Sequence, residues 1–235
     1  MAVLKTDVLV LKTIKFGDSS KIVTLYSKDL GKLKAIVKGA RNYKSGLSGK
    51  FQPLNYLSVI LYFKVNRDIQ NISKAEFLNS YKNLLKDFNK LQTALKILEI
   101  INRSLPDLDP NPPLFDIVSD SFSAIDNSDS EEDLILLNFQ IEFLRLSGML
   151  PDLADNPDNL ETLKTNSEFN LNENDIEFLL KMSERKTGNS FGINKKESYN
   201  VTKISECFTN YIINHNSSRI IFKSDKVFRE INKLN

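Results

Sequence analysis

An alternation of apolar and polar residues, followed by a change to helical spacing, limits the possible folds of this chain. Between residues 56 and 65 every second residue is apolar, which is the period of a β-strand with one buried face. Similar short runs cover residues 3–12, 20–26, 32–38 and 69–73, with turns rich in Gly, Asp and Asn between them. Five short strands within about seventy residues predict an OB-type β-barrel, and an SH3-like barrel would give a similar pattern.

From about Ala75 onward the apolar residues follow the spacing of helices. The first predicted helix carries apolar residues at steps of three and four, namely Leu84, Phe88, Leu91, Leu95 and Leu98. Further helices are expected near residues 114–125, 133–147, 174–185, 201–211 and 225–234. These patterns predict an α+β multidomain chain, with a five-stranded OB-type barrel at residues 1–80 and an all-helical domain at residues 81–235.

The small net charge of +2 hides an uneven distribution of charged residues. Residues 1–80 carry 14 Lys and Arg against 5 Asp and Glu, whereas residues 104–184 carry 3 against 19. The basic part would attract phosphates, and the acidic part would repel them, meet a basic protein or remain solvated. No apolar run reaches the ~18 residues of a membrane span, and Lys5 and Asp7 interrupt the N-terminal apolar stretch, so a cytoplasmic protein is expected.

Basic residues concentrate on one predicted strand and the loop that follows it. Three lysines of the strand share a face, the loop adds cations and aromatic residues, and two tyrosines and a lysine share a face of the next strand. The candidate residues for binding a polyanion are Lys32, Lys34, Lys38, Arg41, Lys44, Lys50, Tyr56, Tyr62 and Lys64. A solvated strand face, an ordinary mobile loop and tyrosines chosen for strand propensity would explain the same pattern.

Two groups of residues could indicate catalysis. Cys207 and His215 lie near one helical stripe, but eight residues at ~1.5 Å each place them ~12 Å apart, too far for a nucleophile and its base. A two-metal nuclease site could be built from acidic residues, which helix N-termini also collect for capping: Asp107, Asp109, Asp116 and Asp120. The glycines form no phosphate-binding motif. The chain is therefore expected not to be an enzyme, with a nuclease and a protein-only adaptor as alternatives.

Several segments resemble the bacterial recombination mediator family RecO. The most specific is GKLKAIVKGAR at residues 31–41. The other N-terminal segments are TDVLVL at 6–11, GDSSKIVTLY at 17–26, LNYLSVILY at 54–62 and AEFL at 75–78. LEII at 98–101 and LRLSGMLPDL at 144–153 are similar to the helical domain of the family, and the likeness weakens past residue 155.

The resemblance implies an N-terminal OB fold followed by a helical domain. It also implies binding of single- and double-stranded DNA, annealing of strands, and help in loading the recombinase RecA onto DNA coated with single-stranded-DNA-binding protein. RecR is the implied partner, and association with the nucleoid is the implied location. The residues by themselves indicate only a basic barrel that could bind nucleic acid.

One feature of the family is missing from this sequence. Many RecO proteins carry a four-cysteine zinc site after a GxxPxL segment, but here Asn156 to Asn159 stand near the first CxxC position, and Cys207 is the only cysteine. Zinc is not expected, because it needs three or four nitrogen or sulfur ligands, and no other cofactor is expected. The loop near residues 152–172 is expected to be more mobile without this metal.

Overall fold

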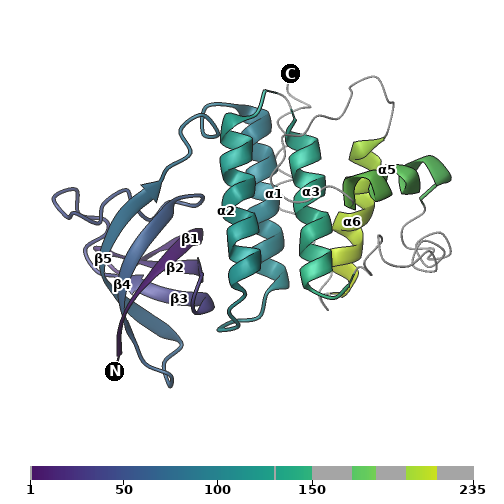
Figure 1. Cartoon of the computed structure of the whole chain (residues 1–235). Coiled ribbons are helices and arrows are strands. Elements are labelled where there is room, and N and C mark those ends of the chain that lie inside the picture. Colours follow the sequence, from purple (N-terminus) through teal and green to yellow (C-terminus); the bar gives the residue numbers. More distant parts are fainter. Residues whose placement is uncertain (1, 130, 150–170, 184–199, 216–235) are drawn as a thin grey trace. The chain divides into compact units, whose positions relative to one another are not determined.

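The structure is a computed structural model that describes residues 2–129, 131–149, 171–183 and 200–215 (Figure 1). It forms two compact units, one reaching Asp126 and the other beginning at Asn127. Each unit is described by itself below. The expected loop at 152–172, with Asn156 to Asn159, and the expected last helix at 225–234 lie outside the described residues, apart from the end of the loop.

The first unit begins with a five-stranded barrel. Its strands are β1 (Ala2–Phe16), β2 (Ser20–Ser27), β3 (Gly31–Val37), β4 (Tyr56–Phe63) and β5 (Ile69–Asn79). They are ordered β1-β2-β3-β5-β4, and β4 pairs back onto β1 to close the barrel. Only β3 and β5 pair in parallel. The predicted five-stranded OB-type barrel is confirmed.

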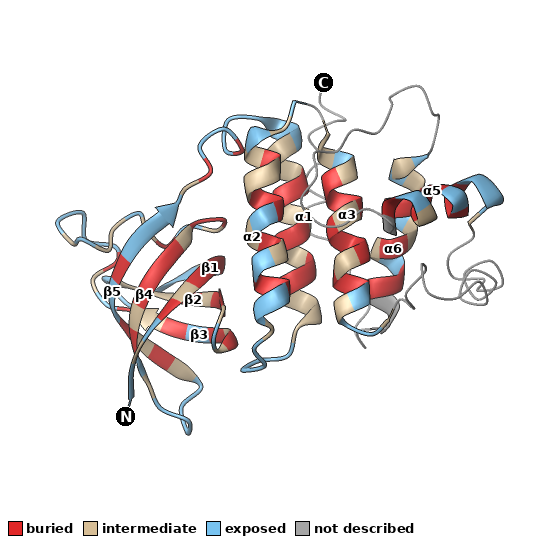
Figure 2. Cartoon of the chain, viewed as in Figure 1, coloured by how far each residue is buried: buried red, intermediate tan, exposed pale blue. Residues whose placement is uncertain are grey.

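Alternate residues of the strands fill the barrel because successive side chains point to opposite faces of a sheet. In β3, Leu33, Ala35 and Val37 are buried, whereas the alternating residues are half-buried (Lys32, Ile36) or exposed (Lys34) (Figure 2). The other strands contribute Val8, Val10, Val23, Leu25, Leu57, Val59, Leu61 and Ile72 to the same core. The predicted alternation along β3 is confirmed.

Strand β5 is longer than predicted, and the first helix begins later. Residues 75–79, expected to start the helical part, continue β5 beside β4, where Ala75 pairs with Val59. Helix α1 covers Phe88–Ser104, and Leu84, expected on its stripe, is fully buried before the helix begins. The sequence AEFL suits either structure locally, so pairing with β4 decides it.

The buried face of α1 also differs from the predicted stripe. Leu98 is buried as expected, but Leu91 and Leu95 are only half-buried. The other buried residues of the helix are Thr93, Ala94, Ile97, Ile100 and Ile101. Both sets of residues have helical spacing, so the periodicity identified the helix without fixing which side of it faces inward.

Helix α2 (Pro112–Asn127) continues the first unit and agrees with the predicted helix at 114–125. Asp126, near its end, accepts a hydrogen bond from the backbone N–H of Leu84 at 2.7 Å, and its carbonyl accepts one from Lys90 Nζ at 3.2 Å. Tyr81 packs edge-on against Phe122 with ring centroids 5.7 Å apart. These contacts join the end of α2 to the residues around the start of α1.

The second unit contains α3 (Glu132–Leu146), α5 (Glu173–Ser183) and α6 (Val201–His215), close to the predicted helices. A polar network joins α3 to α6: the fully buried Gln140 donates to Ser205 O at 3.1 Å and Thr209 Oγ1 at 2.7 Å, and it accepts from Ser205 Oγ at 2.9 Å. Phe208 of α6 is fully buried, as its position on the apolar stripe predicted. In the described part of the chain, no helix has the length and apolar character of a membrane span.

Candidate nucleic-acid interface

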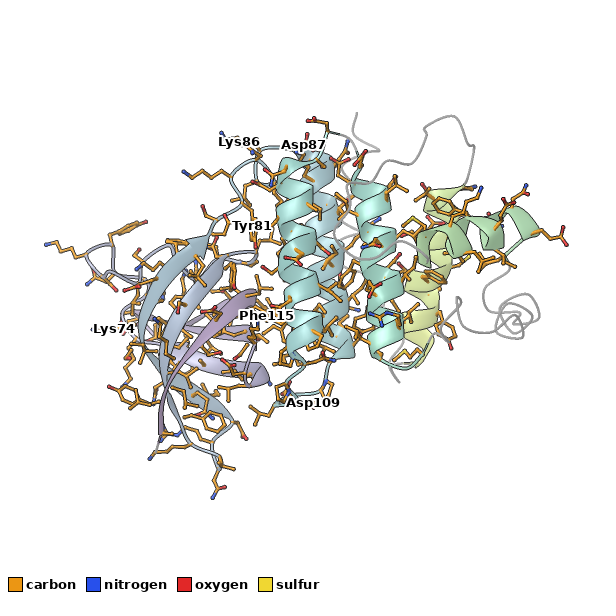
Figure 3. All side chains as sticks on the ribbon, viewed as in Figure 1. Lys74, Tyr81, Lys86, Asp87, Asp109 and Phe115 are labelled. Carbon is orange, nitrogen blue, oxygen red and sulfur yellow. The ribbon has the colours of Figure 1, made fainter. Side chains whose placement is uncertain are left out.

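One side of the barrel is covered by α2. Tyr26 and Tyr56 point outward from β2 and β4 and pack against Phe115 of α2, with ring centroids 5.5 and 5.9 Å away. Figure 3 shows Phe115 where α2 faces the barrel. Lys28 donates to both carboxylate oxygens of Asp116 at 2.7 and 2.9 Å. Burial, followed by the Asp7 carboxylate, raises the pKa of Tyr56 to about 12. This side of the barrel is therefore taken up by protein contacts.

Lys32, the first lysine of the predicted basic strand face, lies at the end of α1. Its ammonium donates to Asn102 O at 3.0 Å and Leu105 O at 2.5 Å, and it lies 3.4 Å from Asp107 Oδ1. A helix C-terminus leaves carbonyl groups without partners, so a cation there satisfies them and interacts favourably with the helix dipole. With its side chain only 13% exposed, Lys32 has a structural contact that its place on the strand did not predict.

Two of the predicted loop cations hold the β3–β4 loop in place. Arg41 Nη1 donates to Gly17 O at 2.7 Å, and its backbone N–H donates to Ser19 O at 2.9 Å, so the loop is held to the β1–β2 turn. Lys50 Nζ donates to Ala75 O of β5 at 2.6 Å. Arg41 is exposed and Lys50 is half-buried, so only Arg41 leaves much of its charged group open to a ligand.

The remaining candidate cations are exposed. Lys34, Lys38, Lys44 and Lys64 have exposed side chains and form no ion pair with any described residue. The barrel adds cations that the sequence argument did not select, all exposed and equally without an ion pair to a described residue: Lys5, Lys12 and Lys74. Lys74 lies on the side of the barrel away from α1 and α2 (Figure 3).

The strand register shows how these cations are arranged. Lys12 of β1 and Lys34 of β3 are both partners of Thr24 in β2. Because neighbouring strands are ~4.8 Å apart, the backbones of the two lysines lie about 10 Å apart. Lys5 of β1 and Lys74 of β5 are related in the same way through Ile60 of β4. Phosphates of a strand lying across the sheet could reach such pairs. Alternation in β1 could have identified Lys5, whereas a bulge between Val10 and Lys12 shifts the pattern at Lys12.

The two candidate tyrosines have the same orientation on β4 but different surroundings. Tyr56 packs against α2, whereas Tyr62 is 37% exposed and pairs with Val3 of β1 and Asn71 of β5. Tyr43, in the basic loop, is 96% exposed. Of these three tyrosines, Tyr62 and Tyr43 present a ring that a base could stack on.

The groups considered for catalysis do not come together in the described residues. Asp107 lies beside Lys32, and Asp116 binds Lys28. Within the described ranges, no cluster of three or more His, Cys, Asp or Glu side chains could hold a metal ion. Cys207 is half-buried on α6, and burial raises the pKa of its thiol, which disfavours the reactive thiolate.

Comparison with known proteins agrees with this layout. The family profile described as "Recombination protein O N terminal" matches residues 1–81, the barrel. The profile "Recombination protein O C terminal" matches residues 85–212, from the start of the helical part into α6. The chain belongs to the RecO family. The two RecO profiles meet between β5 and α1, whereas the compact unit that contains the barrel also includes α1 and α2.

Several curated proteins named DNA repair protein RecO are similar to part of this chain. A protein named DNA repair protein RecO from Chlorobium limicola is 36% identical over 151 residues, 64% of this chain and 58% of its own length. Proteins of the same name from Salinibacter ruber and Exiguobacterium are 27% and 30% identical over 150 residues, 64% of this chain, and 58% and 59% of their own lengths. The match therefore spans less than two thirds of each relative.

Proposed function

We propose that this chain is a DNA-binding recombination mediator in DNA repair. The proposed DNA-binding surface is the side of the barrel away from α2. The observation that carries the proposal is the group of exposed cations without ion pairs to described residues, Lys34, Lys38 and Lys44 among them. Such cations attract phosphates, and when they neutralise the phosphates of bound DNA, the counterions condensed on that DNA are released. The RecO relatives are named DNA repair proteins, which supports the same process.

The finer roles rest on family membership. They are binding of both single- and double-stranded DNA, annealing of strands, and help in loading the RecA recombinase onto DNA coated with single-stranded-DNA-binding protein, with a RecR-type partner. A non-enzymatic role is favoured over a nuclease because the relatives are named DNA repair proteins, a name that describes no enzymatic reaction. A nuclease would instead release shorter DNA fragments when incubated with magnesium or manganese.

A salt series with a charge variant tests the proposal. Lys34→Ala, Lys38→Ala and Lys44→Ala together should weaken DNA binding and lower the slope of log affinity against log salt. The slope should fall by up to about two units for single-stranded DNA, at ~0.7 per phosphate contact. A matched control is Lys82→Ala with Lys86→Ala, two exposed cations of the same unit outside the barrel. Equal salt slopes for the wild type and the triple variant would exclude this surface.

A further inference from the structure

The outward face of the barrel carries a row of isoleucines that the described residues leave at least partly open, with Ile14 exposed and Ile22 and Ile36 half-buried. The strand register makes Ile14 of β1, Ile22 of β2 and Ile36 of β3 neighbours, each paired directly with the next. Their side chains point outward because alternate residues such as Val23 fill the core. Ile14 is 47% exposed, and Phe16, the next outward residue of β1, is 50% exposed. These three isoleucines are called the isoleucine row below.

Cations lie on both sides of the isoleucine row. Lys12 and Lys34 precede the isoleucines of their strands by two residues, so their side chains point to the same outward face. Lys38 follows β3 on the other side, and the hydrogen bonds of Arg41 hold the β3–β4 loop against the β1–β2 turn. That turn carries one carboxylate, Asp18. The row is thus an apolar strip between positive charges.

We propose that this face distinguishes single-stranded from double-stranded DNA, because only the single strand uses the isoleucine row. The proposal rests on the DNA-binding function proposed above. A duplex keeps its bases stacked and paired, so it meets the face only through phosphates and therefore through the cations. An unpaired strand also offers the faces of its bases, and burying them against apolar side chains adds to the phosphate contacts. An apolar strip for a protein partner would not need flanking cations on both sides.

The test replaces two isoleucines without changing the shape of the strands. Ile14→Thr with Ile36→Thr keeps β-branched side chains, which suit strands, and makes the two ends of the isoleucine row more polar. Fluorescence anisotropy is measured with labelled oligothymidine, a duplex of equal length and an abasic strand of equal length. Affinity for oligothymidine should fall on the order of tenfold, and duplex affinity should change less than about twofold. Leu85→Ser, at a 51% exposed residue outside the barrel, is the matched control.

The abasic strand separates base contacts from phosphate contacts. The wild type should bind it about as weakly as the double variant binds oligothymidine, and the double variant should lose little further affinity on it. If the double variant lost equal affinity for single strand and duplex, or lost affinity for neither, the proposal would be overturned. The triple lysine variant distinguishes this failure from a failure of the proposed function, since it should lose affinity for both DNA forms whatever the isoleucines do.

Discussion

Lys32 and Lys34 point outward from the same strand but have different surroundings. Lys32 binds two carbonyls at the end of α1, whereas Lys34 is exposed and has no ion pair with a described residue. Lys32→Met should lower the free energy of unfolding by about 1.5–3 kcal/mol, as expected for hydrogen bonds from a charged group, and leave the salt slope of DNA binding unchanged. Lys34→Met is the matched control: it should leave the free energy of unfolding nearly unchanged and lower the salt slope of DNA binding. Urea unfolding and a salt series measure both, and a lowered salt slope for Lys32→Met would show that this lysine contacts DNA.

Tyr56 links the stability of the first unit to pH. Burial raises its pKa in the folded state to about 12, above the ordinary value of 10.0. The neutral phenol is favoured in the folded state, so its contribution is complete below about pH 10 and is lost as pH rises towards about 12. Tyr56→Phe cannot ionise, so its free energy of unfolding should fall less than that of the wild type between about pH 9 and about pH 11. Urea unfolding at each pH measures this. An equal loss of unfolding free energy in the wild type and in Tyr56→Phe would show that Tyr56 does not cause the pH dependence.

At the scale of elements, strand periodicity predicted which face of a strand each residue takes, but not which side of the barrel it lies on. Tyr56 and Tyr62 have the same orientation on β4, yet one packs against Phe115 and the other is 37% exposed. A twisted, closed sheet carries the ends of one strand to different sides, and only the tertiary position of α2 decides which is covered. The basic loop and β3 were found from sequence, whereas the contacts of Lys32 and Lys50 depend on segments distant in the chain.

The connection between α1 and α2 is joined to the start of β3. The backbone N–H of Leu108 donates to Lys32 O at 2.8 Å, and the backbone of Asp109 passes so close to Gly31 that a Cβ would overlap it. Gly31 also has φ +70°, which favours glycine. Gly31→Ala should therefore destabilise the first unit by more than about 1 kcal/mol, whereas Gly17→Ala, at φ +55° with open space around it, should cost only the backbone strain. Thermal unfolding compares the two, and equal melting temperatures would show that the connection moves aside.

At the scale of the whole molecule, composition and periodicity predicted a basic barrel followed by helices, and the family profiles meet between these two parts. They did not predict that α1 and α2 would form one compact unit with the barrel, because this depends on particular contacts such as that of Phe115 with Tyr26. The basic and acidic parts of the sequence therefore meet within the first unit, where Lys28 binds Asp116. High salt should weaken this exposed ion pair as well as the DNA binding proposed for the barrel.

Two compact units predict that one can be destabilised without the other. Phe208 is fully buried in α6, which packs against α3 within the second unit. Phe208→Ala should lower the stability of that unit by roughly 3–5 kcal/mol, because it loses buried apolar area and leaves a cavity. Hydrogen exchange measured by mass spectrometry should then show faster exchange in peptides from α3 and α6 and nearly unchanged exchange in β1 to β5. The DNA binding proposed for the barrel should persist in this variant. Equal loss of protection in barrel and helices would show instead that the chain unfolds as a single cooperative unit.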